Sequence, residues 1–180
     1  MDLVSAIGFG DNMKRIETIG FISAFPGTGK SSIYGNAPKN GLYPVRANGT
    51  AIFRMVPGPG DAFVYDSDSS TFDKAEFPGN YIQHMREIIH RHAGDNYLVM
   101  VSSHAEVREE MQKVGIPYVL VYPDRSLKGE YIERYKRRGS PEGFIKLMDE
   151  KWDDFIDTCE FDTQCDKIVL GPYQYLSDVL

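Results

Sequence analysis

The sequence predicts an α/β domain in which a central, mostly parallel sheet of five strands lies between two layers of helices, as a three-layer sandwich. Two observations carry this prediction. Short, almost continuous apolar runs alternate with segments of helical periodicity, and such runs are typical of strands that are buried on both faces. A glycine-rich turn follows the first run directly, as expected where a buried strand passes into a helix.

The expected strands cover residues 18–23, 62–65, 97–101, 118–122 and 167–170. Helices are expected from Asn80 to about His92, over residues 103–115, over residues 126–139 and from Ser140 onward. Residues 103–106 have the pattern of a capping box, and Pro141 suits the first turn of the last helix. The periodicity of that helix predicts an inward face made of Phe144, Leu147, Met148, Trp152 and Phe155.

Residues 33–60 interrupt the alternation because they are rich in Gly, Pro and Asn. The helix after the first turn must therefore be short. Asn48 and Gly49 lie between the apolar runs 42–46 and 50–54, and Asn-Gly in this setting is the strongest short signal for a β-hairpin. We therefore predict a hairpin around residues 42–56, inserted at the edge of the functional site in a single domain of residues 1–180.

The composition is that of an ordinary globular chain of 180 residues, long enough for one sizeable core. The net charge of −6 argues against broad electrostatic binding to nucleic acid, although a local basic groove stays compatible with it. Cys159 and Cys165 match no metal motif, and two buried thiols fit a reducing cytoplasm. No run is long enough to span a membrane and no secretory signal is evident, so we expect a cytoplasmic protein without membrane contact.

The most informative stretch is residues 24–31, Ala-Phe-Pro-Gly-Thr-Gly-Lys-Ser, which we call the glycine turn. It has the pattern of a P-loop, apart from Ala24 in place of the opening glycine. Gly27 and Gly29 let successive backbone N–H groups point into one concavity. Lys30 can reach the β- and γ-phosphates, and the Ser31 hydroxyl can ligate Mg²⁺. With ATP and Mg²⁺ as cofactors, the predicted binding residues are Pro26, Gly27, Thr28, Gly29, Lys30, Ser31 and Ser32.

Two acidic residues, Asp66 and Asp68, follow the second expected strand. Ligands of open α/β sheets gather at the carboxyl ends of the strands. There Asp66 can hold Mg²⁺, and Asp68 can orient an acceptor hydroxyl or accept its proton. The alternative is a polar turn that caps the following segment. Arg86, on the next helix, either binds an anionic group of the acceptor or pairs with Glu87 or solvent.

Residues 125–138 form a basic run with six basic and two acidic side chains. The run predicts a helical lid around residues 126–139. Arg134 and Arg138 lie four residues apart, share a helix face and could neutralise a migrating phosphoryl charge. The alternative is a charged surface helix. Of the four histidines, His104 has the best claim to a role in the site, because it follows the third expected strand.

The chain resembles the small P-loop kinases, a group that includes adenylate, shikimate and gluconate kinases. The resemblance rests on the glycine turn, on Asp66-Ser67-Asp68 and on the arginines at 134–138. The chain is also similar to compact phage proteins labelled adenylate kinase or ATP-binding protein. These share the Phe-Pro-Gly-Thr-Gly-Lys-Ser, Asp-Ser-Asp-Ser-Ser and Arg-Arg-Gly-Ser-Pro-Glu stretches. The resemblance covers roughly residues 17–176. The stretch 67–96 contains no obvious copy of the pocket that holds a nucleoside monophosphate in adenylate kinase.

The resemblance implies the P-loop NTPase fold. It places Lys30 on the phosphates, Ser31 and Asp66 near the metal, and Asp68 on the acceptor hydroxyl. It also places Arg134 and Arg138 in the lid. A phage-encoded protein of this kind would work in the host cytoplasm.

The leading functional hypothesis is therefore a Mg-ATP-dependent phosphotransferase that acts on a small acceptor, with a nucleotide or nucleoside favoured. One alternative is a kinase acting on a nucleic-acid hydroxyl, either a polynucleotide end or a hydroxylated base. The basic lid with Arg46 and Arg54 would then form a local groove. A third hypothesis, of another class, is an ATP-binding switch or partner protein with little catalysis. The sequence does not indicate an oligomeric state.

Overall fold

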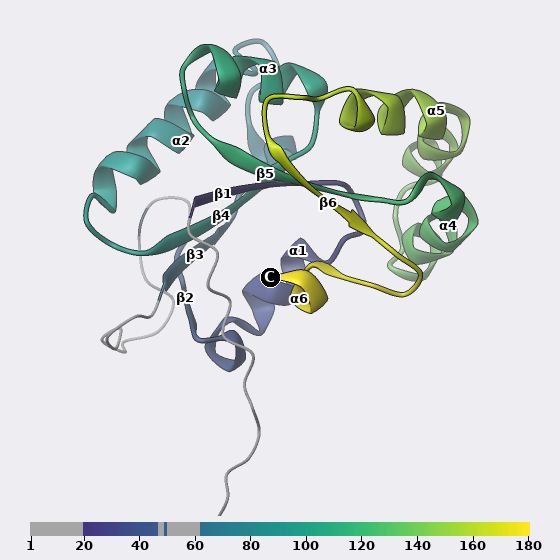
Figure 1. Cartoon of the computed structure of the whole chain (residues 1–180), viewed down its shortest axis with the longest axis horizontal. Helices are drawn as coiled ribbons and strands as arrows, with labels where there is room; N and C mark the ends of the chain where they lie inside the picture. The colour runs from purple at the N-terminus through teal and green to yellow at the C-terminus, as the bar shows by residue number, and fades with distance from the viewer. Residues whose placement is uncertain (1–19, 47–48, 50–61) are drawn as a thin grey trace, which may run out of the picture.

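The computed structural model describes residues 20–46, 49 and 62–180, and its centre is a sheet of six strands. The strands are β1 (Gly20–Ala24), β2 (Leu42–Pro44), β3 (Ala62–Asp66), β4 (Tyr97–Ser102), β5 (Tyr118–Pro123) and β6 (Asp166–Leu170). They are ordered β2-β3-β4-β1-β5-β6, and every neighbouring pair is parallel (Figure 1). The prediction of an α/β domain built on a parallel sheet is confirmed.

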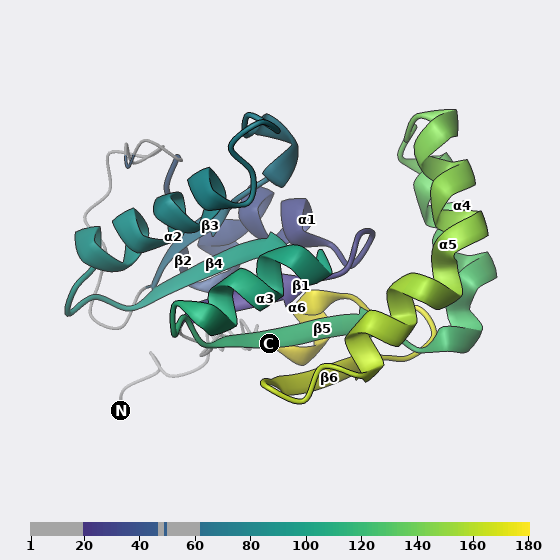
Figure 2. The same cartoon turned by 90° about the horizontal axis from the view of Figure 1, so that it is seen from above.

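Helices cover both faces of this sheet. They are α1 (Lys30–Gly35), α2 (Gly79–Arg91), α3 (Ala105–Lys113), α4 (Lys128–Arg137), α5 (Glu142–Glu160) and α6 (Leu176–Val179). Three 3₁₀ turns are η1 (Ala37–Asn40), η2 (Ser69–Thr71) and η3 (Arg125–Leu127). In Figure 1, α2, α3 and α5 lie on one side of the sheet and α1 and α6 on the other. Figure 2 shows α4 and α5 side by side at one end of the sheet.

The central strands are buried on both faces, which explains their continuous apolar runs. In β1, Phe21 packs in the core beneath α2, α3 and α5, whereas Ile22 and Ala24 pack in the core beneath α1 and α6. The edge strand β6 differs, because its Lys167 and Val169 side chains are exposed. Within residues 20–46, 49 and 62–180, no helix combines the length and apolar character that crossing a membrane requires.

The predicted strand count was wrong by one. Leu42 pairs in parallel with Ala62, so the expected first arm of the hairpin is an edge strand of the main sheet. Leu42 is buried there against the α1 side, and the Tyr43 ring meets the Phe63 ring edge to face. The Asn-Gly signal reports only local turn chemistry and carries no information on a partner strand elsewhere in the chain. The expected second arm, residues 50–56, lies outside the described residues, and so does Arg54.

Two predicted helix caps were also wrong. Helix α2 has Pro78 at its N-cap, so Asn80 lies inside the first turn rather than before it. Helix α3 has His104 at its N-cap without a side-chain hydrogen bond, so the capping box at residues 103–106 does not form. The Ser103 carbonyl instead accepts a hydrogen bond from Arg108 Nε, which a local capping pattern does not reveal.

Candidate functional site

A cavity of about 1030 Å³ opens at the carboxyl ends of the central strands. Four parts of the chain supply most of its lining. These are the glycine turn with the start of α1, the segment 66–70 after β3, the segment 102–105 between β4 and α3, and the pair of helices α4 and α5. The cavity is therefore where the rule for open α/β sheets places a ligand.

The glycine turn is packed so closely that Gly27 has no room for a side chain. Gly27 has a φ of +84°, and an added Cβ would lie 2.9 Å from Cε1 of Tyr135. The Tyr135 hydroxyl donates to the Pro26 carbonyl at 2.8 Å, which holds the ring against the turn. Thr28 is fully buried and its hydroxyl donates to the Phe25 carbonyl at 2.7 Å. The Thr28 side chain therefore braces the turn and does not line the cavity, whereas Pro26 and Gly27 do.

The segment before α6 supports the same turn from the other side. The Leu176 N–H donates to the Thr28 carbonyl at 2.9 Å. The Tyr175 ring covers Gly29, where an added Cβ would lie 3.1 Å from the ring at a φ of +96°. The predicted nucleotide-binding turn is thus completed by residues from the far end of the chain.

Lys30 places its ammonium group at the cavity. Its Nζ donates to the Ala24 carbonyl at 2.9 Å. Burial, with a smaller contribution from Arg138, lowers the pKa of Lys30 to about 8, although Asp66 and Asp68 oppose the shift. An ammonium has three donors, so this cation can also bind an anion in the cavity.

Ser31 and Asp66, which the sequence assigned to a metal, lie together. Ser31 Oγ donates to Asp66 Oδ2 at 3.0 Å. Burial raises the pKa of Asp66, while the Ser31 hydroxyl and Lys30 oppose that shift. A hydroxyl beside a carboxylate offers the hard oxygen ligands that Mg²⁺ prefers. In the described part of the chain no three His, Cys, Asp or Glu side chains form a metal cluster, so Mg²⁺ would take its remaining ligands from water and phosphate.

Asp68 lines the cavity and also caps the turn that follows it. Its Oδ1 accepts from the Ser70 N–H at 2.8 Å, so the structural alternative considered above does occur. Tyr81 supports this segment from behind. Its hydroxyl donates to the Ser67 carbonyl at 2.6 Å and accepts from the Ser102 N–H at 3.1 Å. The ends of β3 and β4 are thereby tied together at the cavity.

Arg134 is almost fully buried and contacts three separate segments. It donates to the carbonyls of Gly27 at 2.9 Å and Gln174 at 3.0 Å, and to Glu130 Oε1 at 2.5 Å. Its guanidinium carbon lies 4.4 Å and 3.9 Å from the centroids of two rings, those of Tyr131 and Tyr175. These contacts fasten α4 to the glycine turn and make Arg134 a positioning residue. The predicted contact with a migrating phosphoryl group stays a prediction.

The other predicted arginines differ in their placement. Arg138 is exposed and lines the cavity, with its Nε donating to Ser140 Oγ at 2.7 Å. Its neighbour Arg137 also lines the cavity. Arg86 lies on the exposed face of α2 and is not part of the cavity lining. The structure therefore brings Arg138 to the site and leaves Arg86 away from it.

One wall of the cavity was not predicted from the sequence. Helix α5 contributes four apolar side chains to it, Phe144, Leu147, Met148 and Phe155. Their spacing predicted an inward face, but that face was interpreted as core. Leu147 is in fact 47% exposed. Also missed were Ser102, Ser103, Thr158, Cys159 and Tyr175. Cys159 is buried as expected, whereas Cys165 is only partly buried.

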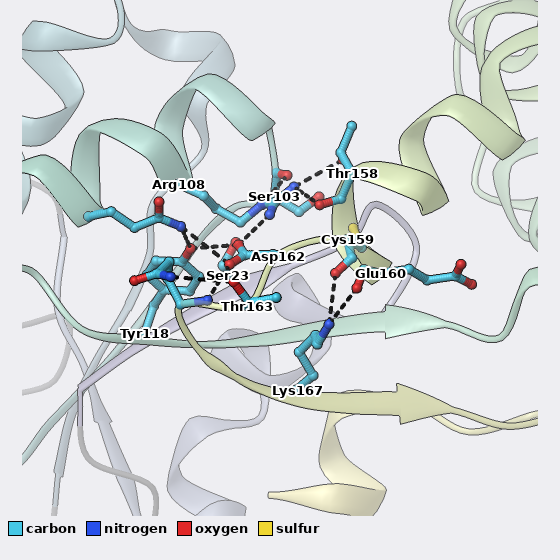
Figure 3. Close-up of polar contacts among 12 residues, drawn as sticks. Ser23, Ser103, Arg108, Tyr118, Thr158, Cys159, Glu160, Asp162, Thr163 and Lys167 are labelled. Atoms are coloured by element: carbon cyan, nitrogen blue, oxygen red, sulfur yellow. Dashed lines mark hydrogen bonds and ion pairs between the residues drawn. The ribbon is translucent and has the colours of Figure 1, made fainter.

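A buried polar network holds part of this wall in place (Figure 3). Arg108 donates to the Ser103 carbonyl at 3.1 Å and to Thr158 Oγ1 at 3.0 Å, so it joins two lining residues. It also pairs with the buried Asp162 at 2.5 Å. Burial alone would raise the pKa of Asp162, but hydrogen bonds from Tyr118, from a backbone N–H and from Arg108 together hold it below its ordinary value.

Comparisons with known proteins add little to this geometry. No family model matches the chain, and no curated protein matches it. A crystal structure of an uncharacterized protein from Eubacterium ventriosum ATCC 27560 is similar at 14% identity and a TM-score of 0.40. The match covers 89% of this chain and 93% of that one. So remote a similarity carries no argument about function. The fold and the site define an α/β protein with a parallel six-stranded sheet and a cavity at its carboxyl edge that has charged, polar and apolar lining residues.

Proposed function

We propose that this protein is a Mg-ATP-dependent phosphotransferase of the P-loop NTPase fold, acting on a small acceptor of the nucleotide or nucleoside type. The observation that carries the proposal is the 3.0 Å contact between Ser31 and Asp66. The Lys30 ammonium lies at the same cavity. A metal-ligand pair and a phosphate-binding cation therefore meet at one site, as phosphoryl transfer requires.

ATP with Mg²⁺ supplies the phosphoryl group and neutralises phosphate charge when bound. Ser31 and Asp66 would hold the metal, and Lys30 would donate to phosphate oxygens. Asp68 accepts the proton of the acceptor hydroxyl or orients that hydroxyl. Arg138, which also lines the cavity, would donate to the transferring group. Arg134 acts through the glycine turn, because its donors hold the carbonyls of Gly27 and Gln174.

The test is ADP release from Mg-ATP by the purified protein against a panel of acceptors, with Lys30→Ala as the blank. The panel contains nucleosides, nucleoside monophosphates, small hydroxy acids and short DNA. Stimulation by one class, lost in Lys30→Ala, supports the kinase and names its acceptor class. Stimulation by DNA alone would favour the nucleic-acid alternative. ATP binding without turnover on any acceptor would favour the switch alternative.

The assigned role of Asp68 has its own test. Asp68→Asn keeps the hydrogen bond that a side-chain oxygen accepts from Ser70 but cannot take up a proton. Turnover should be lost while ATP affinity stays nearly unchanged. An equal loss of ATP affinity and turnover would contradict its assignment to the acceptor.

A further inference from the structure

The cations that line the cavity are confined to one part of it. They are Lys30, Arg134, Arg137 and Arg138, so all of them come from the glycine turn with the start of α1 or from α4 with the residue that follows it. The guanidinium of Arg134 is already committed to two carbonyls and to Glu130. Lys30 and Arg138 both line the cavity, and their charges interact. The phosphates of a nucleotide can therefore be bound by the three other cations of the lining, Lys30, Arg137 and Arg138.

The rest of the lining carries no lysine or arginine. It comprises the segment after β3, the segment between β4 and α3, and α5. Its formal charges are the carboxylates of Asp66 and Asp68. His104 also lies there, and burial lowers its pKa, with Lys30 and Arg108 adding to the shift and Glu106 opposing it. Burial therefore favours the neutral form of His104. Lys30 interacts with both carboxylates, and Arg138 reaches the start of α5, with its guanidinium carbon 5.5 Å from the Phe144 ring centroid. Beyond Phe144, the α5 lining of Leu147, Met148, Phe155 and Thr158 carries no charged side chain, so an anionic acceptor group there would have no cation to pair with.

The same part of the cavity offers apolar surface. Phe144, Leu147, Met148 and Phe155 lie along α5, and Leu147 keeps 47% of its surface exposed. Phe144 is fixed by an edge-to-face contact with Tyr135 at 5.1 Å between ring centroids. An apolar wall with a few polar groups is the usual lining of a site for a small organic ligand.

We propose that the phosphoryl acceptor is an uncharged alcohol that carries a flat aromatic ring, of the nucleoside type, and not a nucleoside monophosphate. The proposal rests on the proposed function and narrows it. The acceptor hydroxyl binds Asp68, and the ring system packs on the apolar wall of α5. Ser102, Ser103 and Thr158 also line the cavity, and the hydroxyls of the two serines would bind polar groups of the ring. The network around Arg108 fixes Ser103 and Thr158.

Binding can be measured apart from catalysis, because the chain contains a single tryptophan. Trp152 packs on Phe25, which lines the cavity, with 5.5 Å between ring centroids. With a non-hydrolysable ATP analogue and Mg²⁺ present, uridine, thymidine, guanosine and their 5′-monophosphates are titrated while Trp152 emission is recorded. One nucleoside should bind at least about tenfold more tightly than its own monophosphate, which is about 1.4 kcal/mol.

The outcomes separate the two proposals. Equal or tighter binding of the monophosphates, or no binding of either kind, overturns the inference. ADP release stimulated only by monophosphates also overturns it but leaves the kinase standing. Nucleoside binding without any stimulated ADP release overturns the kinase and, with it, the role of this compound as a phosphoryl acceptor.

A charge added to the apolar wall of α5 tests whether the acceptor binds there. Leu147→Arg should raise the affinity for a monophosphate relative to its nucleoside by up to about fivefold, the value of an exposed ion pair. The matched control is Glu150→Arg, on an exposed position of the same helix that does not line the cavity. The control should leave the ratio unchanged. An unchanged ratio in Leu147→Arg, or an equal change in both variants, would show that the acceptor does not lie on this wall.

Discussion

Replacing Gly27 with alanine should destabilise the protein, because the glycine turn has neither the backbone conformation nor the space for a side chain. The φ of Gly27 is +84°, and an added Cβ would lie 2.9 Å from the Tyr135 ring and 3.3 Å from the Tyr131 ring. Neither ring can retreat easily. Both are fully buried, and the Tyr135 hydroxyl is held by the Pro26 carbonyl.

The expected loss has two parts. A left-handed backbone costs a residue with a Cβ about 1–2 kcal/mol relative to glycine. Overpacking against the rings adds about 1–3 kcal/mol. The sum for Gly27→Ala is about 2–5 kcal/mol, and in a chain of this length each kcal/mol lowers the Tm by about 2–4 °C.

The variant Gly94→Ala distinguishes the cost of the left-handed backbone from the cost of overpacking against the rings. Gly94 has nearly the same φ, +87°, but nothing lies within 4 Å of an added Cβ. Its variant should lose only about 1–2 kcal/mol. The assay is urea unfolding of both variants, followed by the emission of Trp152. Equal losses in the two variants would refute the claim that aromatic rings close off the glycine turn.

Three further expectations follow. The pKa of Lys30 is about 8 in the folded chain against an ordinary value of 10.5, so the unfolded chain binds more protons between these pH values. The free energy of unfolding of the parent chain relative to Lys30→Met should therefore rise from pH 8 to 10.5, whereas burial raises the pKa of Cys159 and Cys165 to about 11 and acts in the opposite direction in both proteins. A difference between the two proteins that does not change with pH would contradict this. Asp66→Asn should weaken ATP binding in Mg²⁺ but hardly in EDTA; calorimetric titrations showing equal weakening in both would remove Asp66 from the metal site. Arg108→Met leaves the Asp162 carboxylate buried and unpaired, which should cost about 3–5 kcal/mol. A urea midpoint equal to that of the parent chain would show that the network in Figure 3 is not structural.

The central part of the site could be predicted because its signals are local. Residues 24–31 carry their own turn chemistry, and Asp66 follows a strand whose apolar run is unmistakable. Parallel strands bring their carboxyl ends to one edge of a sheet, so the approach of Ser31 to Asp66 follows from the topology. The strand at Leu42 was missed because its partner, Ala62, is supplied by the fold and not by the neighbouring sequence.

Charge patterns were less informative than turn patterns. Arg134 and Arg138 share one basic run, yet one is almost fully buried among backbone carbonyls and the other is exposed. The difference comes from Gly27 and Gln174, which are remote from Arg134 in sequence. For the same reason, helical periodicity placed Leu147 on the inner face of α5 but did not distinguish a cavity wall from a core.

The hydrogen bond from Leu176 to Thr28 joins nearly opposite ends of the described chain. Closing so long a loop is entropically costly, and contacts of this kind form late in folding. During synthesis, β1 and the residues of the glycine turn leave the ribosome long before Tyr175 and Leu176 exist to brace them. The turn therefore reaches its final shape only once the last elements of the sheet have docked. In a nascent chain the glycine turn should consequently acquire its final conformation only at the end of folding, after the rest of the domain has formed.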